Sequence, residues 1–124
     1  CMMVAHWARQ TAPEDLRRVQ AALLVAPADL ATPMPEGYPG VELLERHGWL
    51  PLPRAPLPFP SLVAASSNDP LAALARTRGF ARDWGSALVE LGPLGHVNPA
   101  SGHGHWPQAR QLLQQLLASA PLPA

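Results

Sequence analysis

Short apolar runs bounded by turn-forming residues recur along the chain, at residues 20–27, 61–67 and 87–91. Residues 21–26 are apolar at every position, and so are residues 62–65 within the second run, which is typical of strands that are covered on both faces. Between the second and third runs, residues 71–84 carry apolar side chains at helical spacing, and Gly85 follows as a C-terminal stop. The pattern therefore predicts three strands, with a helix between the last two.

Helices are also predicted at both ends of the chain. Residues 1–10, CMMVAHWARQ, are apolar on all sides, which indicates a helix buried against a sheet. Residues 13–15 begin with proline and predict a second short helical turn. Pro107 suits the first position of a final helix over 109–118, whose leucines repeat at helical spacing, and PLPA at 121–124 ends it.

Residues 28–60 differ in character because they are rich in proline. Each proline removes a backbone donor and fixes φ, which makes a central strand here implausible. Residues 41–48 could hold about two helical turns ended by glycine. We expect an excursion or lid within a single domain of residues 1–124, because several large apolar side chains need a surface to pack on: Trp49, Leu50, Leu52, Leu57 and Phe59.

Strands that alternate with helices predict the α/β fold class with a parallel sheet. Three strands alone make a narrow sheet, and a crossover helix needs a strand at each end. A chain that opens with a helix is therefore expected to follow another strand. Position 1 is a cysteine and not an initiator methionine. We therefore expect the 124 residues to be the C-terminal portion of a longer protein, without its N-terminal part.

Composition narrows the class of protein. With 48% hydrophobic and 15% charged residues, the chain is apolar enough for a folded core. Its formal net charge is zero and its arginines are not clustered, which argues against a nucleic-acid partner. The single cysteine fits a reducing compartment, and neither a signal peptide nor a membrane-spanning run is visible. We predict a cytoplasmic protein with no membrane partner; oligomeric state stays open.

Two polar residues follow predicted strands at positions suited to catalysis. Asp69 comes after residues 61–67, and His96 comes a few residues after 87–91. The carboxyl ends of parallel strands meet at one edge of the sheet, where functional groups gather. A carboxylate there could orient an imidazole that accepts a proton. Asp69 could instead only cap a turn, and His96 could be a hydrogen-bonded loop residue.

Other residues offer weaker alternatives for chemistry. His96, His103 and His105 share one Gly- and Pro-broken segment, but no carboxylate or cysteine lies near them in sequence to complete a zinc site. Cys1 could act as an N-terminal thiol nucleophile, although its apolar surroundings do not favour a thiolate. Ser66 and Ser67 lie near Asp69, but serines at strand ends usually bond the backbone locally.

Three segments in order, SLVAASSNDP, LVELGPLGHVN and ASGHGHWPQARQLL, resemble the small α/β-hydrolases of the YdeN and retinoblastoma-binding protein nine type. The opening CMMVAHWA is similar to the helix that follows the nucleophile elbow of that family. The resemblance spans nearly the whole chain and is weakest in the proline-rich window. It implies an α/β-hydrolase fold, here the C-terminal portion of a three-layer αβα sandwich.

The resemblance also implies a Ser…Asp…His triad, with Asp69 as the acid and His96 as the base. These 124 residues contain no G-x-S-x-G motif, so the implied serine would lie three positions before Cys1. The implied function is hydrolysis of carboxylic esters or related small acyl substrates, with no cofactor and no metal. Two alternatives remain open, a non-catalytic protein-interaction domain with a hydrolase-like fold and a metal-binding protein.

Overall fold

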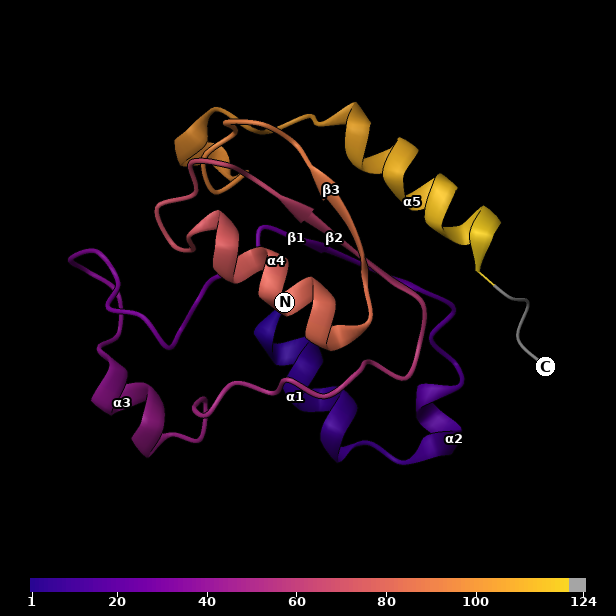
Figure 1. The fold of residues 1–124 in the computed structure, drawn as a ribbon, viewed down its shortest axis with the longest axis horizontal. Coiled ribbons are helices and arrows are strands. Elements are labelled where there is room, and N and C mark those ends of the chain that lie inside the picture. Colours follow the sequence, from indigo (N-terminus) through magenta and orange to yellow (C-terminus); the bar gives the residue numbers. More distant parts are fainter. Residues whose placement is uncertain (121–124) are drawn as a thin grey trace.

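A computed structural model describes residues 1–120, and its sheet consists of three parallel strands (Figure 1). They are β1 (Ala22–Val25), β2 (Ser61–Ala65) and β3 (Ala87–Glu90), in the spatial order β1-β2-β3. The three predicted strands and their parallel arrangement are confirmed, each within its apolar run. The stop predicted at 121–124 lies outside the described residues.

Helices cover both faces of this sheet. On one face lie α1 (Met2–Gln10) and α4 (Leu74–Trp84), and on the other lies α5 (Pro107–Ser119) (Figure 1). The short helices α2 (Pro13–Leu16) and α3 (Val41–Arg46) lie in the connections. The layers are therefore helix, sheet and helix, as expected for a portion of an αβα sandwich.

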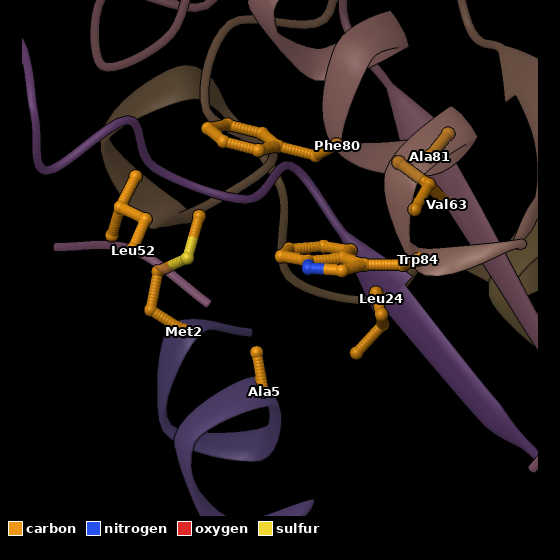
Figure 2. Close-up of a cluster of buried hydrophobic side chains, with 8 residues drawn as sticks. All are labelled: Met2, Ala5, Leu24, Leu52, Val63, Phe80, Ala81 and Trp84. Atoms are coloured by element: carbon orange, nitrogen blue, oxygen red, sulfur yellow. The ribbon is translucent and has the colours of Figure 1, made fainter. Parts of the chain in front are cut away.

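The alternation of side chains along β2 divides the core into two clusters. Val63 points toward α1 and α4, whereas Leu62 and Ala64 point toward α5. All five residues of β2 are buried, so the strand predicted to be covered on both faces is covered. Figure 2 shows the larger cluster, which consists of Met2, Ala5, Leu24, Leu52, Val63, Phe80, Ala81 and Trp84.

Two predictions about helices need correction. We expected residues 1–10 to form a buried helix, but Met3 is 68% exposed and Trp7 is 39% exposed. Only one face of α1, with Met2 and Ala5, packs on the sheet. The helix predicted from residue 71 begins at Leu74, because the preceding residues form a turn in which the Asp69 carboxylate accepts a hydrogen bond from the Leu71 amide.

The proline-rich window packs on α1 and α4 through its second half. Leu52 and Phe59 are buried. The indole Nε1 of Trp84 donates to the Pro53 carbonyl at 2.8 Å, and the Leu57 amide donates to the Trp84 carbonyl at 2.9 Å. Large apolar side chains of this window therefore find the surface that the sequence pattern required.

Candidate active site

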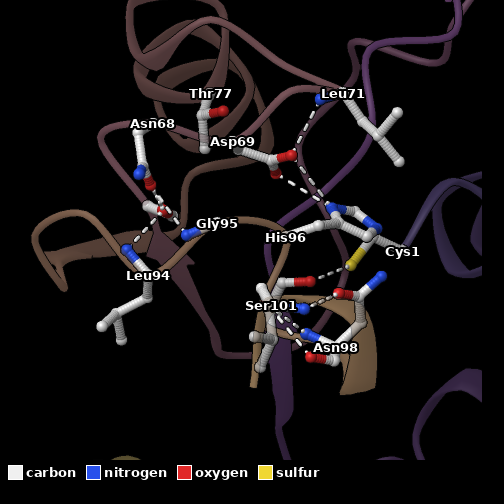
Figure 3. A network of polar contacts seen from close by, with 12 residues as sticks. Cys1, Asn68, Asp69, Leu71, Thr77, Leu94, Gly95, His96, Asn98 and Ser101 are labelled. Carbon is white, nitrogen blue, oxygen red and sulfur yellow. Dashed lines mark hydrogen bonds and ion pairs between the residues drawn. The ribbon is translucent and has the colours of Figure 1, made fainter. Parts of the chain in front are cut away.

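Asp69 and His96 meet at the carboxyl edge of the sheet. Asp69 follows β2 and His96 follows β3, which are neighbouring parallel strands. The Nδ1 atom of His96 lies 3.0 Å from Oδ2 and 3.1 Å from Oδ1 of Asp69 (Figure 3). The structure thus brings together the two residues that strand order singled out, although they are 27 positions apart in sequence.

Burial makes the two members of this pair unequal. The side chain of Asp69 is 3% exposed, and that of His96 is 25% exposed. The Leu71 amide donates to Asp69 Oδ1 at 2.8 Å and fixes the carboxylate from a second side. Within residues 1–120, no hydrogen bond engages Nε2 of His96. A carboxylate that receives Nδ1–H leaves Nε2 as the basic nitrogen, which is the arrangement of a general base.

A small hollow of about 180 Å³ opens beside His96. Tyr38, from the proline-rich window, and Leu71, from the turn after β2, both line it. Drug-sized ligands usually occupy pockets of roughly 300–1,000 Å³, so this hollow suits a small group. The complete lining consists of Tyr38, Pro70, Leu71, Gly95, His96, Asn98, Ala100 and Ser101.

The other histidines of the segment do not join this pair. His103 Nδ1 lies 3.2 Å from Ser101 Oγ, and His105 is exposed. Among residues 1–120, no three His, Cys, Asp or Glu side chains are grouped as a metal ion would require. In the same part of the chain, no helix is long and apolar enough to cross a membrane.

Two alternative nucleophiles, Ser66 and Cys1, differ in their burial. Ser66 is 2% exposed, and its Oγ accepts from the Leu94 amide at 3.0 Å and donates to Asn68 Oδ1 at 3.1 Å. Cys1 is exposed, and its Sγ donates to the Val25 carbonyl at 3.4 Å. Neither side chain hydrogen-bonds His96 in the structure, so neither forms a nucleophile–base pair with it.

The protein family of this chain follows from a comparison with family models. The family model described as "Serine hydrolase" matches residues 1–115. The chain belongs to the serine hydrolase family. A similar solved structure is that of a YdeN-like hydrolase from Pectobacterium atrosepticum, with 28% sequence identity and a TM-score of 0.71. No curated protein matches the chain.

The alignment with that hydrolase covers 94% of this chain and 54% of the other. This chain therefore spans about half the length of the YdeN-like protein. The match confirms the YdeN-type resemblance and, with the three parallel strands between helices, a partial α/β-hydrolase fold. The assignment to the serine hydrolases rests on the family model over residues 1–115, and the similar solved structure agrees with it.

One charged pair of this serine hydrolase was not indicated by the sequence pattern. Asp29, in the loop after β1, is 1% exposed and accepts from Arg76 of α4 at 2.7 and 3.1 Å. Thr32 and the Ala31 amide also donate to this carboxylate. The Asp29 amide donates to the Leu71 carbonyl at 2.9 Å, which ties this loop to the turn that holds Asp69. An aspartate soon after a predicted strand was the only signal in the sequence.

Replacing Arg76 by alanine should lower the free energy of unfolding by about 2 to 3 kcal/mol, because a buried carboxylate loses its charged partner. This loss is smaller than for a fully buried ion pair because the Arg76 side chain is 46% exposed. Arg78→Ala is the matched control on the same helix, since its ion pair with Glu90 lies at the surface. Urea unfolding at pH 7 measures the free energy of unfolding of both variants. Equal losses in the two variants would contradict the stabilising role of the buried pair of Asp29 and Arg76.

The same variant should change how stability depends on pH. Burial alone would raise the pKa of Asp29, but hydrogen bonds from Arg76 and Thr32 outweigh it and the pKa lies below its usual value. The carboxylate therefore stabilises the fold fully above its unfolded pKa of about 4, and this contribution is lost as the pH falls through the lower folded pKa. As the pH falls below about 4, the free energy of unfolding of Arg76→Ala should decrease less than that of the parent protein.

Proposed function

We propose that this chain supplies the acid and the base of a Ser-His-Asp triad in a hydrolase of carboxylic esters or related acyl compounds. The observation that carries the proposal is the contact of His96 Nδ1 with the buried Asp69 carboxylate at 3.0 Å, at the carboxyl edge of a parallel sheet. Membership of the serine hydrolase family supports it. No cofactor is required for this chemistry.

The proposed serine lies three positions before Cys1, and the start of α1 supports that place. In α/β-hydrolases the nucleophile sits on a sharp turn between a strand and a helix. Here α1 begins at Met2, and the Cys1 thiol bonds the last carbonyl of β1, Val25. The N-terminus of α1 therefore lies at the same carboxyl edge of the sheet that carries Asp69 and His96.

In the proposed reaction, the serine oxygen attacks the acyl carbon while Nε2 of His96 takes the serine proton. Asp69 holds the imidazole in its reactive tautomer and stabilises the imidazolium. The tetrahedral intermediate collapses, the alkoxide leaves with the proton from Nε2, and an acyl-enzyme remains. Water then attacks the acyl-enzyme with His96 as base again, which releases the acid and restores the serine.

The hollow beside His96 supports a preference for small groups. It holds about 180 Å³, and Tyr38 from the proline-rich window stands in its wall. We assign this window the role of a lid that sets substrate choice over the site. A long acyl chain would exceed the hollow unless the window moved.

We also propose a cytoplasmic location, with no nucleic-acid or membrane partner.

Hydrolysis of p-nitrophenyl esters of increasing acyl length tests the function. The protein should be purified with the residues that precede Cys1, and p-nitrophenyl acetate and butyrate should be hydrolysed faster than the octanoate. The absence of G-x-S-x-G from these 124 residues favours one rival, a non-catalytic interaction domain. A protein that unfolds cooperatively but hydrolyses none of the esters would support that rival.

A further inference from the structure

We propose that Ser66 and Asn68 are positioning residues that hold the turn before His96 and so keep its imidazole on Asp69. The inference rests on the proposed function, because it assigns these residues to the same site. Both lie directly after β2, whereas the turn they hold follows β3. Neither contacts the Asp69 carboxylate or the imidazole by a hydrogen bond, so their action would pass through the backbone.

Two consecutive backbone amides before His96 are held by these side chains (Figure 3). Asn68 Oδ1 accepts from the Gly95 amide at 2.7 Å, and Ser66 Oγ accepts from the Leu94 amide at 3.0 Å. Ser66 Oγ also donates to Asn68 Oδ1 at 3.1 Å, which links the two acceptors into one clamp. We call Ser66 and Asn68 the β2 clamp.

Asn68 is the more important member of the β2 clamp. The Leu94 amide also points to the Gly92 carbonyl at 3.0 Å, so it has a second acceptor when Ser66 is lost. The Gly95 amide has Asn68 Oδ1 as its acceptor. Loss of the Asn68 carboxamide would leave the amide N–H of Gly95, the residue directly before His96, without this bond.

The turn needs such a clamp because its backbone is unusual on both sides of His96. Gly95 has φ of +64° and Val97 has φ of +53°. The left-handed region is unfavourable for a β-branched residue and persists only where surrounding contacts impose it. After His96, Asn98 and Ser101 cap the short helix of residues 99–101 reciprocally. The β2 clamp supplies the corresponding restraint before His96.

The close approach at Gly95 indicates how tightly the turn is held. A Cβ atom placed on Gly95 would lie 2.6 Å from the Cβ of Ser101. The two sides of the turn are therefore packed against each other with no room for a side chain. When one side of such a turn moves, the imidazole that it carries moves with it.

Asn68→Ala tests the inference with two readouts in the protein that includes the residues before Cys1. The first is the downfield proton resonance of the His96 Nδ1–H bond to Asp69, which needs no nucleophile. The second is ester hydrolysis. We expect the variant to broaden or lose the resonance and to lower kcat at least tenfold, with KM changed less than threefold. Asn68→Asp keeps the acceptor oxygen and should keep the resonance and most of kcat.

Ser67→Ala is the matched control, because Ser67 lies between the two clamp residues and its backbone amide, not its side chain, bonds the β3 loop. It should behave as the parent protein does. A merely structural role would lower the melting temperature of Asn68→Ala and leave the resonance in place, and that result would overturn the inference. Loss of the resonance in Asn68→Asp as well would also overturn it.

The experiment separates this inference from the proposed function. A parent protein that shows the resonance but hydrolyses no ester refutes the function alone. The effect of Asn68→Ala on the resonance then still decides whether the clamp positions His96. Ser66→Ala should give a smaller loss than Asn68→Ala, since the Leu94 amide retains the Gly92 carbonyl as acceptor.

Discussion

Replacing His96 by alanine should lower kcat/KM for ester hydrolysis by about 10⁴-fold or more, in the protein that includes the residues before Cys1. His96 is the only group proposed to take the serine proton and return it to the leaving group, so its loss removes both steps. Asp69 contacts the imidazole at Nδ1, on the side away from Nε2, so it is not placed to take over the proton transfer. Steady-state rates with p-nitrophenyl acetate measure the effect.

His105→Ala is the control for this variant. His105 is exposed and belongs to the same Gly-rich segment, and among residues 1–120 no hydrogen bond joins it to the site. Its rate should stay within about twofold of the parent rate. An unchanged rate in His96→Ala, or a comparable loss in His105→Ala, would remove His96 from its proposed role.

Replacing Asp69 by asparagine should lower kcat by roughly 10³- to 10⁴-fold with little change in KM. The amide has nearly the shape of the carboxylate, so its oxygen can still accept from the Leu71 amide. Its NH₂ group would face Nδ1 of His96 and favour the wrong tautomer, and the imidazolium would lose its negative partner. Comparison of kcat with the melting temperature separates this effect from loss of the fold.

Asp15→Asn provides the matched substitution at the surface, where Asp15 pairs loosely with Arg18 at 3.9 Å. It should leave kcat unchanged. The assignment of Asp69 as the acid fails when Asp69→Asn retains more than about a tenth of the parent kcat, because an orienting carboxylate is worth far more than that in a triad.

Much of this fold could be predicted from the periodicity of apolar residues and from the turn-forming residues that separate the runs. The run SLVAA is apolar at nearly every position, and it becomes β2, the central and fully buried strand. Its position between two strands is what brings residues from two loops to one edge. The meeting of Asp69 with His96 was predictable for that reason, since parallel neighbours place their carboxyl ends together.

Other features depend on contacts that no local pattern encodes. α1 looks apolar all round in sequence, yet Met3 faces outward because the sheet offers only one surface to pack on. The pair of Asp29 with Arg76 joins residues 47 positions apart, and it forms only once the loop after β1 lies against α4. The β2 clamp also joins residues that are distant in sequence, because Asn68 bonds the Gly95 amide 27 positions later.

The position of the nucleophile is the most direct test of the proposed triad. The protein with its residues before Cys1 should be treated with a fluorophosphonate and digested, and the adduct located by mass spectrometry. We expect a single adduct on a serine three positions before Cys1, and no adduct in His96→Ala. An adduct on Ser66 or on any other residue of the 124, or none in the parent protein, would contradict it.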